Sequence, residues 1–340
     1  MTSQKPVLVV LGATGNQGGS VIAHFLSLSP APYALRGVTR DPTSSKSLSL
    51  ASLGVEVVAG NYDDPSSLDA AFKDASAIFS VTDFWQSFMD PSLRESTSVS
   101  GQSVGVACRD KEAQQNKNII DAAAKVGTLE RFVFSSLPNM NKLSGGKYSH
   151  VYHFDGKAMA EEYGRSTYPE LWAKTSVFYA GFYLENYFGP TGSLFPLQLD
   201  KERDTIILEC TEPLASAPFP WFSAMADTGP LVQAMLRAAP GQKLLGVNEW
   251  LNFRDFTKSL AQVLGKGSEV VDRSPSFDMG DPDLEKDFAD MLGFCIEFGY
   301  DGGKVDKSIV QPGDLGVPVQ LGPVKEWFAK QDWDKVFQVK

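Results

Sequence analysis

Cysteine is scarce in this sequence of 340 residues. Cys108, Cys210 and Cys295 are odd in number, lie far apart and form no C-x-x-C pair. Disulfide scaffolds and structural zinc sites need cysteines in pairs or short clusters. The sequence therefore predicts reduced thiols, no metal site and an intracellular protein.

The sequence also lacks an excess of positive charge, long apolar runs and internal repeats. The formal net charge of −10 argues against the broad basic surface of a nucleic-acid-binding protein. No apolar run reaches the length of a membrane span, and Met1–Pro6 enters the first expected strand at once, which leaves no room for a signal peptide. We expect a protein of the cytoplasm, with access to the nucleus, that binds neither nucleic acid nor membranes and is a monomer or homodimer.

Predicted strands and helices alternate regularly through about the first 180 residues. This order is typical of a doubly wound parallel sheet, the Rossmann architecture of α/β proteins. The length suggests two units: a nucleotide-binding domain of residues 1–181 with 241–266, and a smaller, discontinuous α+β lobe of residues 182–240 with 267–340 for the substrate. The expected strands are 7–11, 33–39, 55–59, 77–82, 131–136, 175–179 and, later, 243–247.

A glycine-rich turn follows the first expected strand. Its glycines have the spacing G-x-x-G-x-x-G, and a helix-like segment, 20–26, comes directly after. Glycines at such a turn let backbone amides approach a pyrophosphate, and the helix N-terminus adds unpaired N–H groups and a favourable dipole. Because the strand before and the helix after are both present, the motif predicts a dinucleotide site. The residues of this site are Gly12, Ala13, Thr14, Gly15, Asn16, Gln17 and Gly18.

The end of the second expected strand indicates which dinucleotide binds. An acidic residue there would hydrogen-bond the ribose 2′-OH of NAD, whereas an arginine can pair with the 2′-phosphate of NADP. Arg40 lies 22 residues after Gly18, near the usual separation of about 20, and hydroxyls and a second cation follow at 43–46. NADP is favoured. Asp41 keeps NAD open, because a shift of one residue would place a carboxylate at the ribose.

One connection is much longer than the others. About 30 residues, 83–112, separate the fourth expected strand from a helix expected through 119–126, whereas ordinary connections of this kind run about 2–6 residues. Such a connection is typically a lid or a disordered insert, and it leaves the sheet at the carboxyl ends of the strands, where ligands bind. Two interpretations stay open: a cap over the ligand, walled by Trp85, Phe88 and Met89, or an excursion without a role.

A second informative segment contains His153 and Lys157, which lie one turn apart on an expected helix. In short-chain dehydrogenases this pair is a tyrosine and a lysine: the lysine binds the cofactor ribose and keeps the tyrosine acidic enough to protonate the substrate. Lys157 is in place, but histidine replaces the tyrosine. His153 can act as a general acid, or it can be a structural or ligand-contact residue. Tyr148 and Tyr152 are alternative donors, although Tyr152 would point off the face of Lys157.

Six segments, in order along the chain, carry a family resemblance: 10–21 (VLGATGNQGGSV), 38–42 (VTRDP), 60–64 (GNYDD), 81–85 (VTDFW), 153–157 (HFDGK) and 183–186 (YLEN). Together they resemble the NmrA-like family of atypical short-chain dehydrogenases. A histidine in place of the tyrosine is typical of the redox-sensor branch of that family. The resemblance extends over nearly the whole chain and implies a Rossmann fold that binds NADP(H).

The resemblance also implies which residues contact the cofactor. The glycine-rich turn would hold the pyrophosphate, and Lys157 would bind the nicotinamide ribose. Gln114 stands where similar proteins have a lysine contact, and Tyr62 where they usually have a smaller polar residue. The other implied contacts are Arg40, Asp41, Pro42, Thr43 and Ser44 at the 2′-phosphate, Asn61 and Tyr62 at the adenine, Thr82, Asp83 and Phe84 along the ribose and nicotinamide, and Tyr183, Leu184, Glu185 and Asn186 at the nicotinamide end.

Two functions are open at this stage. The first is an NADPH-dependent oxidoreductase that reduces a C=O, C=N or C=C bond of a small molecule in specialised metabolism. Lys157, the long connection 83–112 and the aromatic content of 182–240 favour it. The second is a redox-sensing regulator that responds to NADPH and NADP⁺ and acts through protein partners. His153 favours this second function. The features named for the oxidoreductase make it our preferred interpretation.

Overall fold

The computed structural model describes residues 5–189, 194–273 and 281–339, so the first four residues of the segment expected to enter strand one lie outside it. Its centre is an eight-stranded sheet in which every neighbouring pair is parallel. The strands are, in spatial order, β14 (Ile309–Val310), β11 (Lys243–Gly246), β6 (Thr175–Ala180), β5 (Arg131–Ser136), β4 (Ala75–Ser80), β1 (Val7–Val10), β2 (Ala34–Thr39) and β3 (Glu56–Ala59).

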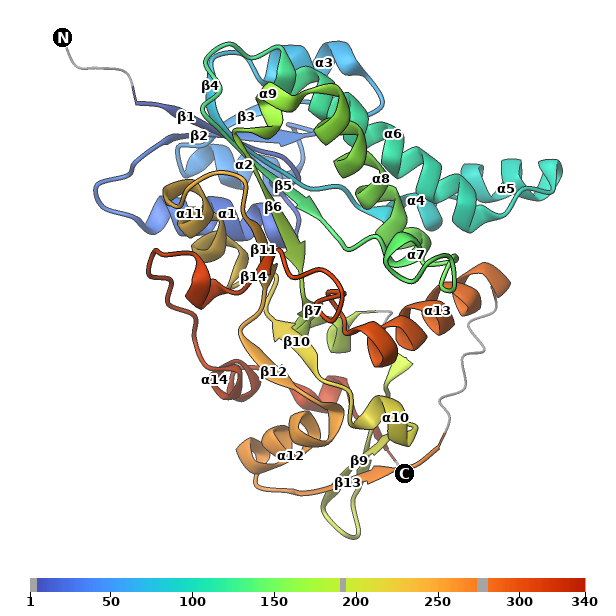
Figure 1. Ribbon diagram of the computed structural model, residues 1–340. Coiled ribbons are helices and arrows are strands. Elements are labelled where there is room, and N and C mark those ends of the chain that lie inside the picture. Colours follow the sequence, from blue (N-terminus) through green and yellow to red (C-terminus); the bar gives the residue numbers. More distant parts are fainter. Residues whose placement is uncertain (1–4, 190–193, 274–280, 340) are drawn as a thin grey trace.

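Helices cover both faces of this sheet. One face carries α1 (Asn16–Ser27) and α11 (Thr228–Arg237), which pack on each other, and the other carries α6 (Val104–Ala124) and α8 (Tyr152–Thr167) (Figure 1). The central strands β1, β4, β5 and β6 are therefore buried almost throughout, including most of their serine residues. The doubly wound fold is confirmed, and each expected strand lies within two residues of an observed one. Shorter helices complete this part: α2 (Ser45–Ser52), α3 (Pro65–Ala71), α7 (Met140–Leu143) and α9 (Pro169–Trp172).

The long connection 83–112 is not a loop, and the prediction of one was wrong. It forms α4 (Phe84–Phe88), α5 (Pro91–Ser100) and the first turns of α6. Each helix begins at a side-chain cap, because Asp83, Asp90 and Ser103 accept hydrogen bonds from the amides of Trp85, Ser92 and Val106. The capping residues resemble those of a polar loop, which is why the sequence misled. Phe88 is buried as expected, but Met89 is exposed.

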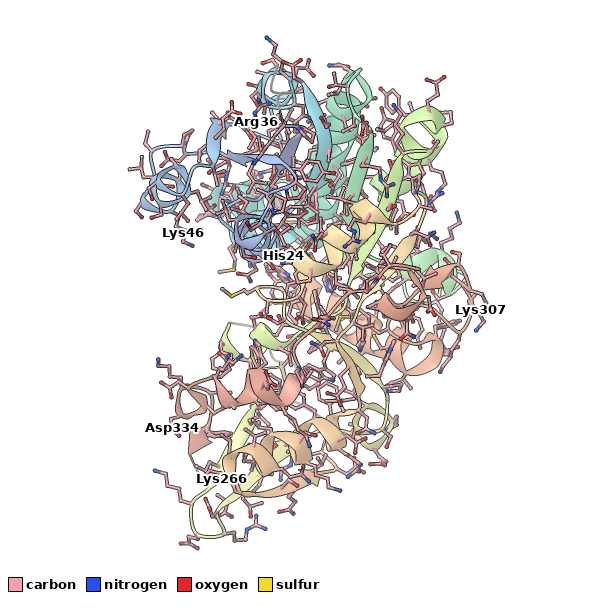
Figure 2. All side chains as sticks on the ribbon, turned by 90° about the vertical axis from the view of Figure 1, so that its left-hand side faces the viewer. His24, Arg36, Lys46, Lys266, Lys307 and Asp334 are labelled. Carbon is pink, nitrogen blue, oxygen red and sulfur yellow. The ribbon has the colours of Figure 1, made fainter. Side chains whose placement is uncertain are left out.

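A smaller part of the molecule holds two further sheets. Figure 2 shows Lys266 and Asp334 in it, at the far end from Arg36 and Lys46. The three-stranded sheet is β12 (Glu249–Leu251), β10 (Phe219–Phe222) and β7 (Phe182–Tyr183), and the four-stranded sheet is β13 (Gly267–Val271), β9 (Thr205–Glu209), β8 (Leu197–Asp200) and β15 (Gln338–Val339). Its helices are α10 (Glu212–Ala215), α12 (Phe253–Leu264), α13 (Pro282–Phe298) and α14 (Val324–Ala329), with 3₁₀ turns η1 (Leu184–Phe188), η3 (Pro312–Asp314) and η4 (Trp333–Lys335).

Aromatic side chains build the core of this smaller part. Trp221 and Phe256 stack with ring centroids 4.2 Å apart, and Phe182, Phe219 and Phe253 close around them. Most aromatic residues of 182–240 are thus packing residues. The division of the chain into two units at 181, 240 and 266 stays a prediction. By contacts, α11 lies on α1 of the large part, whereas α12 packs on β9 and β13 of the small one.

Among the described helices, none is long and apolar enough to cross a membrane. The three cysteines are buried and unpaired. No group of three or more histidine, cysteine, aspartate or glutamate side chains in the described ranges could hold a metal ion.

Candidate functional site

The glycine-rich turn connects β1 to α1 at the carboxyl edge of the sheet. Gly12 has a φ of +61°, and its carbonyl accepts the amide of Gly15 at 2.9 Å. A Cβ on Gly18 would lie 2.3 Å from the oxygen of Gly12 and 2.6 Å from that of Leu11, both backbone atoms. The turn therefore brings strand and helix so close together that only glycine fits at position 18.

The N-terminus of α1 behind this turn is open to an anion. Its N-cap residue, Gly15, has extended backbone and no side-chain cap, and the first turn holds no acidic residue. The first amides of a helix have no intrahelical acceptor. They carry the positive end of the helix dipole, so an anionic group such as a pyrophosphate fits here.

Tyr62 lies against the glycine-rich turn. Its hydroxyl accepts the amide of Gly12 at 2.9 Å. Burial raises the pKa of Tyr62 to about 12, while the hydrogen bond from Gly12 and the charge of Arg40 lower it and the charge of Asp83 raises it. Arg40 and Asp83 are therefore both close enough to Tyr62 for their charges to act on its hydroxyl. Tyr62 is larger than the polar residue that similar proteins usually have here. Its contact with Gly12 nevertheless places this segment beside the predicted cofactor site.

Arg40 and Asp41 have different environments. The Arg40 side chain is exposed and makes no hydrogen bond or ion pair within the described part of the chain. Asp41 instead closes a turn, because its Oδ1 accepts the amide of Thr43 at 2.8 Å and the Thr43 hydroxyl at 2.6 Å. These hydrogen bonds lower the pKa of Asp41. Ser44 caps α2 through the amide of Ser47 at 3.3 Å. Of the two competing residues, Arg40 is the one available to a ligand.

The predicted adenine side is formed by short turns. Asn61 Oδ1 accepts the amide of Asp63 at 3.1 Å, and Asn118 of α6 donates to the carbonyl of Tyr62 at 2.8 Å. Gln114 is exposed and donates to Asn118 Oδ1 at 2.8 Å. The structure thus places Gln114 one turn of α6 from the residue that touches the Tyr62 segment.

Lys157 belongs to a buried polar cluster that the sequence did not reveal. Its Nζ lies 2.5 Å from Oε1 of Glu112, a fully buried residue of α6. Thr82 donates to the same oxygen at 2.8 Å, and Asn116 donates to Thr82 at 2.9 Å. Glu112 Oε2 has no hydrogen-bonding partner among the described residues. The buried carboxylate of Glu112 thus holds the Lys157 ammonium close to Thr82, the second residue after β4.

His153 faces α13, and its side chain is only 10% exposed. Its Nδ1 forms an ion pair with Oδ1 of Asp287, and its backbone amide donates to Oδ2 at 3.2 Å. The rings of Phe154, Trp85 and Phe288 surround the imidazole with centroids 4.7, 5.1 and 5.8 Å away. The carbonyl of His153 also lies 3.4 Å from Nζ of Lys157.

The two tyrosines named as alternative donors lie elsewhere. Tyr152 packs against Gly105, where a Cβ would lie 2.3 Å from its ring. Tyr148 donates to Glu297 of α13 at 2.9 Å. Neither has a recorded contact with Lys157 among the described residues, and His153 is the neighbour of Lys157 on α8.

The residues of segment 183–186 contact different parts of the protein. Gln17 of the glycine-rich turn donates to the Tyr183 hydroxyl at 2.5 Å and accepts from Ser135 at 2.9 Å. Leu184 is buried. Glu185 accepts the Ser223 hydroxyl at 2.5 Å and the amides of residues 224 and 225. Tyr183 is thus the member that touches the predicted cofactor turn, whereas the Glu185 carboxylate anchors a neighbouring loop.

The burial of the Asp155 carboxyl group predicts that the free energy of unfolding depends on pH. It is 5% exposed, and burial raises its pKa to about 7. Since the folded state binds this proton more tightly than the unfolded state, the free energy of unfolding falls as pH rises from about 4 to about 7. Urea unfolding at pH 5 and pH 8 should show a smaller loss for Asp155→Asn than for wild type. The exposed Asp69→Asn should behave as wild type; equal losses in all three proteins would contradict the assignment.

The model of the NmrA-like family matches residues 4–311. The NmrA-like family domain-containing oxidoreductase ptmS of Penicillium ochrochloron is 27% identical, with 97% of this chain and 99% of the relative covered. The oxidoreductase hkm9 of Aspergillus hancockii, with the same family description, is 28% identical, with 97% and 98% covered.

Solved structures show the same fold. NmrA, a negative transcriptional regulator, in complex with NADP superposes with a TM-score of 0.66 at 19% identity, over 96% of this chain and 91% of that one. The NADPH-dependent quinone oxidoreductase QOR2 of Escherichia coli, complexed with NADPH, has a TM-score of 0.63 at 18% identity, over 95% and 98%.

Proposed function

Because this chain belongs to the NmrA-like family, we propose that it is an NADP(H)-dependent oxidoreductase that reduces a C=O, C=N or C=C bond of a small molecule in specialised metabolism. The observation that carries the proposal is the cluster around Lys157. A buried ammonium group and a histidine stand one turn apart on α8, next to Thr82 at the carboxyl edge of the sheet. Two relatives named as oxidoreductases over their whole length support it.

The residues present fit NADP(H). Gly18 leaves the close approach that a pyrophosphate site needs, α1 offers uncapped amides, and the exposed guanidinium of Arg40 can pair with a 2′-phosphate. Asp41 is engaged by Thr43, which weakens the case for NAD. Solved structures of the same fold that contain NADP or NADPH are further support.

The chemistry divides between the cofactor and the chain. Bound NADPH supplies a hydride. In our proposal Lys157 binds the nicotinamide ribose, and His153 gives the substrate a proton. The Trp85 ring of α4 lies against His153. In our proposal this ring helps to exclude water from the reacting atoms.

Arg40→Ala tests the choice of cofactor. Loss of a charge-assisted contact costs about 1.5–3 kcal/mol, so NADPH should bind roughly 10- to 100-fold more weakly. NADH lacks the 2′-phosphate, and its affinity should stay near that of wild type. Fluorescence titration with both cofactors measures the two effects on one variant. Equal weakening of NADPH and NADH would remove Arg40 from the 2′-phosphate site.

The oxidoreductase itself is tested by following NADPH absorbance with a panel of ketones, imines and enones. Substrate-dependent oxidation is the expected result. Tight NADPH binding without consumption by any member would contradict it and support the redox-sensing regulator instead. A search for protein partners in the presence of NADPH and of NADP⁺ would then follow.

A further inference from the structure

Acidic side chains at and within helix α13 form ion pairs and a hydrogen bond with the large part of the molecule. The helix lies alongside the ends of α7 and α8 (Figure 1). Most of its residues are more than 120 positions later in the sequence than those two helices. Each contact joins one carboxylate of the α13 segment to a residue of the α5–α8 region. The pairs are Asp281 with Arg94, Asp283 with Ser103, Asp287 with His153, Asp290 with His150 and Glu297 with Lys147.

The Asp287 contact differs from the others in its burial and in its partner. Asp287 is 1% exposed, and both of its oxygens face His153, one at the ring Nδ1 and the other at the backbone amide. Nδ1 of His153 and Oδ1 of Asp287 meet in an ion pair, and neither atom has a hydrogen-bond partner among the described residues. The hydrogen bonds of His153 within these ranges come from its backbone amide and carbonyl, which leaves the ring Nε2 without one. A carboxylate against one ring nitrogen fixes which nitrogen carries the proton of the neutral imidazole.

We propose that Asp287 is the positioning residue for His153: it fixes the orientation of the ring and the tautomer with the proton on Nδ1, so that Nε2 exchanges the proton of the reaction. This inference rests on the proposed reductase function. The substrate gains a hydride at one atom and the Nε2 proton of the imidazolium at the other. The ring is left neutral, with its remaining proton on Nδ1 facing Asp287, and water reprotonates Nε2.

The arrangement explains why the proton donor is completed by the C-terminal part of the chain. Trp85 and Phe288 stack with centroids 5.8 Å apart and planes 8° apart, and His153 lies against both rings. These rings make the surroundings of the ion pair between His153 and Asp287 largely apolar, so the pair is stronger than it would be at the surface. The α13 helix thus supplies both the carboxylate and one wall of the site.

Asp290 offers a matched control. It lies three residues further along α13 and holds His150 in the same way, through the backbone amide at 3.0 Å and Nδ1 at 2.9 Å. His150 is 43% exposed at its side chain, and no contact joins it to Lys157 among the described residues. Asp290→Asn therefore weakens the same kind of carboxylate–histidine contact between α13 and the large part of the molecule, and it leaves His153 unchanged.

The first readout is the tautomer itself. The chain has only three histidines, so ¹⁵N-histidine labelling gives three rings, and His153→Gln identifies the signals of one. At a pH where the ring is neutral, wild type and Asp290→Asn should show His153 with its proton on Nδ1. Asp287→Asn should shift it toward Nε2. A wild-type ring protonated on Nε2 would overturn the proposal without any variant.

The second readout is turnover with NADPH in the holoenzyme. Asp287→Asn should lower kcat by roughly 100-fold, within the usual contribution of a general acid, with KM and NADPH affinity near wild type. Asp290→Asn should keep kcat. An equal loss in both variants would show that Asp287 only docks α13, and the proposal would fail. Turnover without any effect of Asp287→Asn would also overturn it, while leaving the reductase function standing.

Discussion

We expect Gly18→Ala to lose NADPH binding. The added Cβ would lie 2.3 Å from the oxygen of Gly12 and 2.6 Å from that of Leu11. Both are backbone atoms and cannot turn away as a side chain could. The turn between β1 and α1 must open, and the amides that face the pyrophosphate move with it. Overpacking of this kind costs about 1–3 kcal/mol of stability or more, so calorimetric titration and thermal unfolding should both report it.

Gly19→Ala is the control for this variant. A Cβ at position 19 would lie 3.6 Å from the oxygen of Ala13, an ordinary van der Waals contact. Because alanine is a better helix former than glycine by about 0.5–1 kcal/mol, this variant should be at least as stable as wild type and should bind NADPH. If Gly18→Ala bound NADPH as well as Gly19→Ala does, the turn would not be the pyrophosphate site.

Glu112→Ala has the second large expected effect, on the free energy of unfolding. The variant leaves the ammonium of Lys157, whose side chain is 10% exposed, without the carboxylate that lies 2.5 Å away. Removal of one partner from a buried ion pair typically costs about 3–5 kcal/mol. Thr82 also loses its acceptor, because its hydroxyl donates to the same oxygen. Urea unfolding at neutral pH is the measurement.

Two further variants separate this effect from simple charge loss. Glu162→Ala removes the partner of Lys142 on α8, but that pair is exposed, so the stability should change little. The double variant Glu112→Gln with Lys157→Met removes both charges and should recover most of the stability lost by Glu112→Ala. A double variant as unstable as Glu112→Ala would contradict a buried ion pair as the cause.

Local patterns allowed the doubly wound sheet and its glycine-rich turn to be predicted. The expected strands are short runs, rich in apolar residues and separated by turn residues, and the glycine spacing after β1 is itself a local signal. Arg40 follows its strand at the expected distance from Gly18. The helices α4 and α5 were missed because their N-caps, Asp83 and Asp90, are of a residue type that favours turns as well as helix N-termini.

The other half depends on contacts between distant residues. Glu112 lies 45 positions before Lys157, and Asp287 lies 134 positions after His153. Nothing local marks either carboxylate, since both sit on helices among other charged residues. Glu112 also fell within the segment expected to be a loop. The positions of these two partners follow from the packing of α6 and α13 on α8, which a single sequence does not specify.

Transfer of deuterium tests the central claim most directly. NADPH deuterated at C4 of the nicotinamide is incubated with the protein and the panel of ketones, imines and enones, and the mixtures are analysed by mass spectrometry. The account predicts that one substrate gains one deuterium, at a rate that Asp287→Asn lowers and Asp290→Asn does not. The absence of deuterium from every member of the panel would contradict the claim that this site carries out hydride transfer from NADPH.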